Sequence, residues 1–328
     1  MVVSPKLPQN MMASRRVNRE TTATQEAAFD ITEFRGSFTV MVTPFTEDGA
    51  AIDEKALRRL VEWQIEQGAP GLIPLGSTGE FLSVSTDERT RVVEITVDQA
   101  AGRVPVIIGT ADEWTPKAVR YSKEAERLGA DGVMVVPPYY SSPTEDELFE
   151  HYRQIAEAIS IPVMVYNNPN TANVDLLPPF LARLSEVDNI RYVKESSGDI
   201  ARVREIDHLS EGRMTVFAGY HAYDSIRLGA KGWVSVCGNI VPRLSADVYD
   251  LTAGKEDTAG GGETYHRLLP LLDAISGDLY VSATKAAMAL IGMPVGEPRL
   301  PRLTLPETKI AGLKRVLADL GVVKDEAA

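Results

Sequence analysis

Short apolar runs that end in glycine, proline or polar residues recur along the chain, mostly at intervals of roughly 25 to 35 residues. This interval matches one strand-helix-strand unit, and continuous apolar runs are typical of strands buried on both faces of a parallel sheet. We therefore predict eight strands, at residues 39–45, 71–76, 106–110, 132–137, 163–167, 192–196, 215–219 and 233–238.

The segments between these runs carry start signals for amphipathic helices. Asp53 is placed to cap one helix, and Ser85 with Glu88 forms a capping box at the start of the next. Thr115 followed by Pro116 predicts a cap and a proline in the first helical position. Helices are therefore expected to alternate with the strands.

One helix-to-strand corner is repeated along the sequence. The hexapeptide Arg-Leu-Gly-Ala-Asp-Gly at 127–132 returns as Arg-Leu-Gly-Ala-Lys-Gly at 227–232, and Gly-Ala-Pro-Gly at 68–71 shares its core. In each copy the first glycine is suited to end a helix in the left-handed conformation. Repetition of this corner favours a closed (β/α)8 TIM barrel over an open sheet of six to eight strands.

After Gly238 the strand pattern stops and a helical pattern follows. Helices are predicted there at residues 244–251, 265–275, 281–291 and 308–320. We expect a flexible N-terminal extension at residues 1–30, the barrel at residues 31–240, and a helical C-terminal region at residues 241–328 that packs on the barrel.

The chain is acidic, with 34 Lys plus Arg against 46 Asp plus Glu and a formal net charge of −12. Such a charge repels phosphate backbones and anionic membrane surfaces, so neither nucleic acid nor a membrane is expected as a partner. No apolar run approaches the roughly 20 residues that span a bilayer, and the N-terminal segment lacks the apolar centre of a secretion signal. Arg15, Arg16 and Arg19 would suit a transit peptide, although Glu20 and Glu26 weaken that alternative.

Cysteine and histidine usage argues against disulfides and metal sites. Cys237 is the only cysteine, which excludes an intrachain disulfide and suits a reducing cytoplasm. The four histidines lack the close His/Glu spacing of a zinc site on one helix. We predict a cytoplasmic protein without a metal.

Candidate chemistry lies where the predicted strands end, because active sites of such barrels form at the carboxyl ends of the strands. Lys194 ends the sixth apolar run, and Tyr166 ends the fifth. A buried lysine is costly unless it is paired or used, and burial favours the neutral amine that attacks carbonyl groups. A lysine paired with a carboxylate would be structural, but the position across from Tyr166 favours imine chemistry, with the tyrosine hydroxyl as proton shuttle.

The second apolar run leads into the small-residue turn Gly-Ser-Thr-Gly-Glu at 76–80. Such a turn presents backbone N–H groups and two hydroxyls to an anion, although on its own it is more often only a turn. Combined with an imine-forming lysine, it is expected to hold the carboxylate of a 2-oxo acid. Tyr139 and Tyr140 could form a lid, a packing pair or an interface contact, and we assign no role to His221.

Five motifs carry a resemblance to a known family. They are Val-Thr-Pro-Phe at 42–45, Gly-Ser-Thr-Gly-Glu at 76–80, Pro-Pro-Tyr-Tyr at 137–140, Val-Tyr-Asn-Asn-Pro at 165–169 and Val-Lys-Glu-Ser-Ser-Gly-Asp at 193–199. Together they resemble the dihydrodipicolinate synthase and N-acetylneuraminate lyase family, over nearly the whole chain from Phe34 to Val322. The resemblance implies a class I, pyruvate-dependent aldolase that uses a covalent lysine imine and no cofactor.

By this resemblance Lys194 forms the imine with pyruvate or a related 2-oxo acid, Tyr166 relays protons, and Ser77 and Thr78 hold the carboxylate. Tyr140 matches the tyrosine that reaches into a neighbouring subunit's site to complete a proton relay through Ser77. A homo-oligomer is therefore implied, usually a tetramer built as a dimer of dimers. The further substrate-binding candidates are Gly76, Gly79, Thr43, Thr171, Gly219 and Val234.

The loop at 168–173 departs from the pattern of the synthases. Thr171 stands where they carry an arginine that holds the carboxylate of aspartate semialdehyde, and a threonine hydroxyl cannot replace a bidentate clamp at equal strength. Ser77, where synthases usually carry threonine, is the serine of the lyase branch. We therefore expect a Schiff-base lyase or aldolase with a different second substrate. The alternatives are a true 4-hydroxy-tetrahydrodipicolinate synthase of lysine biosynthesis and a non-catalytic regulatory protein that binds a 2-oxo acid.

Overall fold

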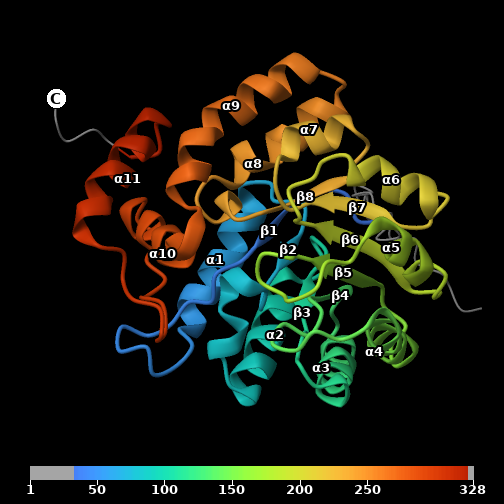
Figure 1. Ribbon diagram of the computed structural model, residues 1–328. Helices are drawn as coiled ribbons and strands as arrows, with labels where there is room; N and C mark the ends of the chain where they lie inside the picture. Colours follow the sequence, from blue (N-terminus) through green and yellow to red (C-terminus); the bar gives the residue numbers. More distant parts are fainter. Residues whose placement is uncertain (1–32, 324–328) are drawn as a thin grey trace, which may run out of the picture. The chain divides into compact units, whose positions relative to one another are not determined.

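Eight parallel strands lie at the centre of the computed structural model, which describes residues 33–323 (Figure 1). Their hydrogen-bonded order is β2-β1-β8-β7-β6-β5-β4-β3. A parallel bridge between Leu72 of β2 and Val106, just before β3, joins the two ends of this order into a ring. The predicted (β/α)8 TIM barrel is therefore confirmed, and the alternative of an open sheet is wrong.

The bounds of most elements agree with the prediction to within a few residues. The strands are β1 Gly36–Val40, β2 Leu72–Ile73, β3 Ile107–Gly109, β4 Gly132–Val135, β5 Val163–Asn167, β6 Ile190–Glu195, β7 Thr215–Ala218 and β8 Gly232–Ser235. The helices are α1 Glu54–Glu66, α2 Thr86–Ala100, α3 Thr115–Arg127, α4 Glu145–Glu157, α5 Pro178–Leu184, α6 Arg202–Leu209, α7 Ala222–Arg227, α8 Pro242–Tyr249, α9 Thr258–Ala274, α10 Tyr280–Leu290 and α11 Glu307–Asp319.

The first two strands differ most from their predicted bounds. Instead of spanning residues 39–45, β1 begins earlier and ends at Val40, because its pairing with β8 lies in the first four residues of the strand. Beyond this point the backbone leaves the sheet, and the Val42 amide donates to Asn239 Oδ1 at 3.0 Å. The chain after β2 turns early because Leu75 has a φ of 59°, in the left-handed region. The first departure is caused by a contact with a distant residue, and the second by the backbone conformation just after the strand.

The helix start signals are confirmed at two of the three predicted caps. The Asp53 side chain accepts a hydrogen bond from a first-turn amide of α1, and Ser85 with Glu88 makes both bonds of a capping box. Thr115 is not the cap of α3, which begins at that residue and follows Trp114. Its hydroxyl is instead engaged by a side chain of α4.

The repeated corner has the predicted conformation in all three copies. Gly68, Gly129 and Gly229 have φ values of 83°, 92° and 116°, which side chains with a Cβ rarely adopt. Each glycine follows a helix, and the chain enters the next strand within a few residues. The chain therefore passes from helix to strand through the same backbone conformation after α1, α3 and α7.

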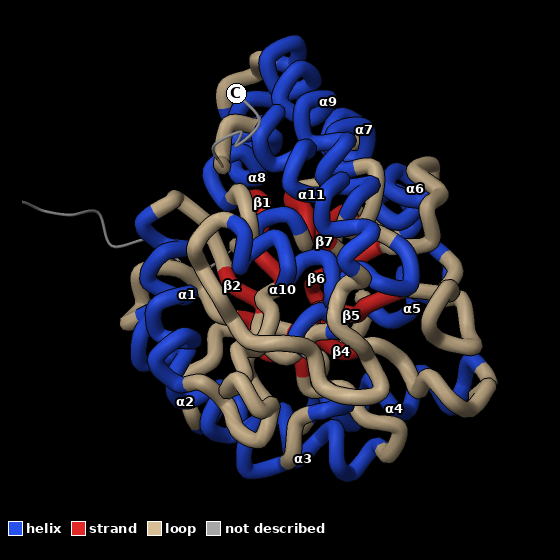
Figure 2. The backbone as a smooth tube through the Cα atoms, turned by 90° about the vertical axis from the view of Figure 1, so that its left-hand side faces the viewer, coloured by secondary structure: helices blue, strands red, loops and turns tan. Residues whose placement is uncertain are grey.

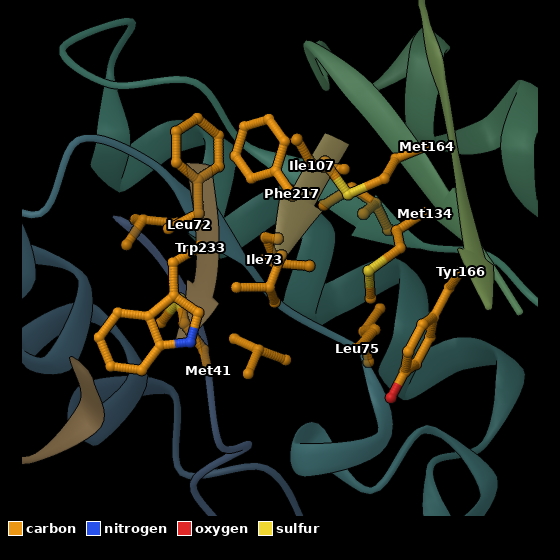
Figure 3. Packing of buried hydrophobic residues seen from close by; sticks show 14 of the residues in the cluster. Met41, Leu72, Ile73, Leu75, Ile107, Met134, Met164, Tyr166, Phe217 and Trp233 are labelled. Carbon is orange, nitrogen blue, oxygen red and sulfur yellow. The ribbon is translucent and has the colours of Figure 1, made fainter. Parts of the chain in front are cut away.

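Aromatic and aliphatic side chains fill the barrel interior. The rings of Phe38 and Phe217 meet edge to face with centroids 5.4 Å apart. Gly71 and Gly232 make room for these rings, because a Cβ at either position would overlap one of them. Figure 3 shows this apolar cluster with Tyr166 at its edge. Since the interior is packed, a substrate site must lie at the strand ends.

The C-terminal helices pack on the barrel and return to its strand ends (Figure 2). Ser245 of α8 shares a hydrogen bond with Ser37 of β1 at 2.7 Å, so α8 covers the outer face of the first strand. The division into residues 1–30, 31–240 and 241–328 stays a prediction, and the first part lies outside the described residues. None of the helices described here has the length and apolar character needed to cross a membrane.

His151 of α4 is a buried titratable group away from the strand ends. It is 4% exposed, and its Nδ1 shares a hydrogen bond of 2.8 Å with the Thr115 hydroxyl. Burial lowers the pKa of His151 to about 4, although the nearby Glu113 and Asp112 oppose this shift. The folded protein therefore holds this imidazole neutral at a pH where an unfolded chain would bind a proton.

We expect the free energy of unfolding to fall as the pH drops from about 6.5 to about 4, because the unfolded state binds a proton at His151 that the folded state excludes. The stabilisation is fully present above the unfolded pKa, and its loss is at most about 3 kcal/mol. His151→Gln should flatten the dependence in urea unfolding followed by circular dichroism. His208→Gln, at an exposed histidine, is the matched control; an unchanged slope in His151→Gln would contradict the assignment.

Candidate active site

Lys194 is buried at the end of β6 and lies against Tyr166 of β5. The two residues are register partners in neighbouring strands, and Lys194 Nζ lies 3.9 Å from the centroid of the Tyr166 ring. Only 7% of Lys194 is exposed. The adjacent Glu195 forms no ion pair with Lys194, and its two oxygens accept hydrogen bonds from Asn167 Nδ2 and the Ser197 amide.

A second buried lysine provides a direct comparison. Lys285 of α10 forms an ion pair with Glu80 at 2.8 Å, and both side chains are at most 1% exposed. Within residues 33–323, Lys194 has no carboxylate in a comparable ion pair, and its Nζ lies over the polarisable face of the Tyr166 ring. Lys285 therefore has the arrangement of a structural lysine, whereas the charge of Lys194 has no such partner among the described residues.

The Tyr166 hydroxyl is oriented by the next turn of chain. Asn168 Nδ2 donates to this oxygen at 2.8 Å, so the phenolic hydrogen is left to donate elsewhere. The preceding Asn167 fixes the loop, because its Oδ1 accepts from the Leu176 amide at 2.9 Å. Asn168 was not among the predicted site residues, although it lies in the Val-Tyr-Asn-Asn-Pro motif at 165–169.

The predicted carboxylate turn follows β2 as a tight 3₁₀ turn at Ser77–Gly79. Thr43 supports it from the segment after β1, since its hydroxyl donates to the Gly79 carbonyl oxygen at 2.7 Å. A Cβ at Gly79 would lie 2.9 Å from a backbone oxygen, and a Cβ at Gly76 would lie 2.8 Å from a Val40 methyl group. The glycines therefore permit the close approach of two backbone segments.

Two further tyrosines, Tyr280 and Tyr220, lie near Tyr166, and Tyr280 also lies near Thr78. Burial raises the pKa of Tyr280, and the neighbouring Tyr166 and Tyr220 raise it further, whereas the Thr78 hydroxyl and the Arg302 guanidinium lower it. Burial also raises the pKa of Tyr220. Both phenols therefore stay protonated hydrogen-bond donors near Tyr166. Tyr220 was recognisable as a residue at a strand end, but no local signal pointed to Tyr280.

The end of the carboxylate turn is anchored to the C-terminal region. Glu80, at the left-handed φ of 56°, accepts a hydrogen bond from the Arg299 amide at 2.9 Å in addition to its ion pair with Lys285. The Phe45 ring lies between these two cations, 4.2 Å from Lys285 Nζ and 4.1 Å from the Arg299 guanidinium carbon. Burial lowers the pKa of Lys285, and Glu80 opposes that shift.

Two other predicted site residues, Tyr140 and Thr171, are exposed in this single chain. Tyr140 is 86% exposed, and its carbonyl oxygen accepts from Asn173 Nδ2 at 2.7 Å. The Thr171 hydroxyl turns back to the Asn168 carbonyl oxygen at 3.4 Å. An exposed Tyr140 is compatible with a role in a neighbouring subunit, and that role stays a prediction.

Two further candidates are structural neighbours of the strand ends. The Gly219 amide donates to the Glu195 carbonyl oxygen at 2.7 Å, and a Cβ at this position would overlap Ser196. Val234 is buried within β8, with 1% exposed. Their part in substrate binding stays a prediction. No cluster of three or more His, Cys, Asp or Glu side chains that could hold a metal ion occurs within residues 33–323.

The structure thus has a parallel barrel with a buried lysine on β6, a tyrosine beside it on β5 and a hydroxyl-rich turn after β2. The model of the dihydrodipicolinate synthetase family matches residues 33–320, and the chain belongs to this family of lyases.

Several known proteins are similar to the chain. The 4-hydroxy-tetrahydrodipicolinate synthase of Syntrophus aciditrophicus is 39% identical over 88% of this chain and 99% of its own. The chloride-inhibited dihydrodipicolinate synthase from Acinetobacter baumannii, solved with pyruvate, has a TM-score of 0.85 and 34% identity over 88% of this chain and 99% of its own. A structure described as a monomeric dihydrodipicolinate synthase variant has a TM-score of 0.84 and 32% identity over 88% of this chain and 98% of its own.

We expect Lys285→Met to lower the free energy of unfolding by about 3 to 5 kcal/mol, because it leaves the Glu80 carboxylate buried without its cation. Thermal and urea unfolding would measure the loss. The double variant Glu80→Gln/Lys285→Met removes both charges and should recover part of it. Arg58→Met breaks the exposed pair with Asp98 at 2.6 Å and should cost less than about 1 kcal/mol. Equal losses of unfolding free energy in Lys285→Met and Arg58→Met would contradict a special role for the buried Glu80–Lys285 pair.

Proposed function

We propose that the protein forms an imine between Lys194 and pyruvate and condenses the resulting enamine with an aldehyde. The observation that carries this proposal is the burial of Lys194 against Tyr166 without a carboxylate partner among the described residues. A lysine amine that is not held in an ion pair is a nucleophile suited to attack a keto carbon. The solved relative from Acinetobacter baumannii with pyruvate supports the choice of the first substrate.

The chemical steps assign a task to each group at the strand ends. The Lys194 nitrogen forms a bond to the keto carbon, and the carbonyl oxygen becomes a hydroxyl. That hydroxyl leaves as water when it receives a proton, which the Tyr166 hydroxyl is placed to deliver, and a carbon–nitrogen double bond forms. Loss of a proton from the adjacent methyl group then gives the enamine, whose carbon attacks the aldehyde. Hydrolysis of the product imine releases Lys194, so no cofactor is needed.

The turn at Ser77–Gly79 is proposed to hold the pyruvate carboxylate. Its hydroxyls and backbone amides are donors of the kind that bind anions, and its glycines admit no side chain that would block them. Thr78 is 3% exposed and lies beside Tyr280, so its position is fixed by packing. The buried Glu80–Lys285 pair holds the end of this turn.

The second substrate that the relatives support is aspartate semialdehyde. Relatives at 36 to 40% identity over nearly their whole length carry the name 4-hydroxy-tetrahydrodipicolinate synthase. They favour the synthase, which was the alternative in the sequence analysis, over an enzyme with a different second substrate. We therefore take the condensation of pyruvate with aspartate semialdehyde as the principal proposal.

One observation favours a second candidate, a lyase or aldolase that cleaves or makes a different 2-oxo acid. The Thr171 hydroxyl is turned toward its own loop, and residues 168–173 contain no cation. A carboxylate on the second substrate would find no charged partner in this loop. The same enamine chemistry with another aldehyde would leave the roles of Lys194 and Tyr166 unchanged.

Assembly into an oligomer is also a proposal. Tyr140 is almost fully exposed in the single chain, whereas its amide and that of Tyr139 are fixed by hydrogen bonds to Glu113 Oε2. A rigid loop that presents an exposed tyrosine is suited to contact a second copy. The monomeric variant among the relatives means that the family likeness does not determine the number of subunits.

Borohydride reduction in the presence of pyruvate should leave a stable adduct on Lys194, detected by peptide mass spectrometry, because reduction converts an imine into an amine. Lys194→Ala should lose both the adduct and activity. Lys123→Ala, at an exposed lysine of α3, is the matched control and should retain both. Absence of an adduct with pyruvate and with longer 2-oxo acids would favour a non-catalytic binding protein instead.

With pyruvate bound, aspartate semialdehyde should be turned over in an assay coupled to reduction of the product. The expected result is saturable turnover that Tyr166→Phe lowers by about 100-fold or more, because the proton donor is lost. A protein that traps pyruvate on Lys194 but does not consume aspartate semialdehyde would contradict the synthase. Release of pyruvate from longer hydroxylated 2-oxo acids, followed with lactate dehydrogenase, would then identify the second candidate.

A further inference from the structure

The proposed second substrate carries a carboxylate, which a cation binds more strongly than neutral donors do. Lys194 is not available for this task, because its nitrogen becomes part of the imine. The loop after β5 has none, since Thr171 takes the position in question. Arg202 of α6 lies near this loop but forms a two-pronged ion pair with Asp175 at 2.7 and 2.8 Å. Its charge is therefore already neutralised.

The segment between α10 and α11 brings another arginine to the strand ends. Arg299 is fixed to the end of the carboxylate turn, because its amide donates to Glu80 Oε2 and its guanidinium pairs with Glu88 at 2.6 Å. Four residues later, the Leu303 carbonyl oxygen accepts a hydrogen bond from the Ser282 hydroxyl at 2.6 Å. Arg302 lies between these two anchors, and its amide donates to the Arg299 carbonyl oxygen at 3.1 Å.

The Arg302 side chain is half-buried and differs from Arg299 in its charge partners. Within residues 33–323, it has no carboxylate in an ion pair, whereas Arg299 and Arg202 each have one. Arg302 also lies near Tyr280, because its positive charge lowers the pKa of that phenol against the larger rise that burial causes. Tyr280 in turn lies beside Thr78 and Tyr166, the residues assigned to the carboxylate turn and the proton shuttle.

We propose that Arg302 binds the carboxylate of the second substrate, with the Tyr280 hydroxyl as a second donor. This inference rests on the proposed function and names the group that substitutes for the arginine missing at Thr171. The cation comes from the C-terminal region, on a segment that Glu80, Glu88 and Ser282 hold by hydrogen bonds. A guanidinium suits this task because its planar fork matches the two oxygens of a carboxylate.

The test compares Arg302→Met, Arg302→Lys and the control Arg204→Met, at an exposed arginine of α6, in steady-state kinetics. Arg302→Met should raise KM for aspartate semialdehyde by about 10- to 100-fold, the loss typical of a hydrogen bond to a charged group. KM for pyruvate and the borohydride adduct on Lys194 should be unchanged. Arg302→Lys should recover part of the loss, because it restores the charge without the fork.

An unchanged KM for aspartate semialdehyde in Arg302→Met would overturn the proposal. An equal rise in KM for both substrates would also overturn it, because Arg302 would then support the pyruvate turn. Increased activity of Arg302→Met toward an uncharged aldehyde such as propanal, relative to aspartate semialdehyde, would support the assignment. If the wild-type protein traps pyruvate but consumes no aspartate semialdehyde, the proposed second substrate is wrong, and the inference about Arg302 fails with it. This outcome is seen in the wild-type protein, whereas a wrong assignment of Arg302 alone is seen only in the variants.

Discussion

Closure of eight parallel strands is the constraint on which the rest of the structure depends. Because every strand runs in the same direction, all carboxyl ends meet at one rim, and polar residues that follow different strands become neighbours. The rings of Phe38 and Phe217 fill the interior, so the rim is the place where a substrate can approach. The register of β5 and β6 places Tyr166 directly beside Lys194.

The two buried lysines show how similar burial produces different chemistry. Lys285 has a carboxylate at 2.8 Å and a carbonyl oxygen at 3.1 Å, so its ammonium is compensated and serves to fix the turn after β2. Lys194 has the face of an aromatic ring, which attracts a cation more weakly than a carboxylate does. The difference lies in the counter-ion rather than in the exposure of the side chain.

The C-terminal helices contribute to the site as well as to the packing of the barrel. Tyr280 stands at the start of α10, and Arg299 lies in the segment that follows this helix. Glu80, at the end of the turn after β2, contacts Lys285 of α10 and the Arg299 amide. These contacts join the turn to a region far along the chain. A change in this region can therefore alter the turn after β2 without touching Lys194 or Tyr166.

The sequence by itself determined the barrel, its repeated corners and the pair Lys194 and Tyr166. These features have local signals, because strand periodicity, glycine conformation and strand-end position are properties of short segments. The tertiary structure alone decided that β1 ends at Val40, where distant groups capture the backbone, and that the Thr115 hydroxyl binds His151 instead of capping α3. It also decided that Glu80 meets Lys285 and that Tyr280 lies beside Tyr166. No short segment encodes such meetings, because they depend on how the closed barrel and the returning helices pack together.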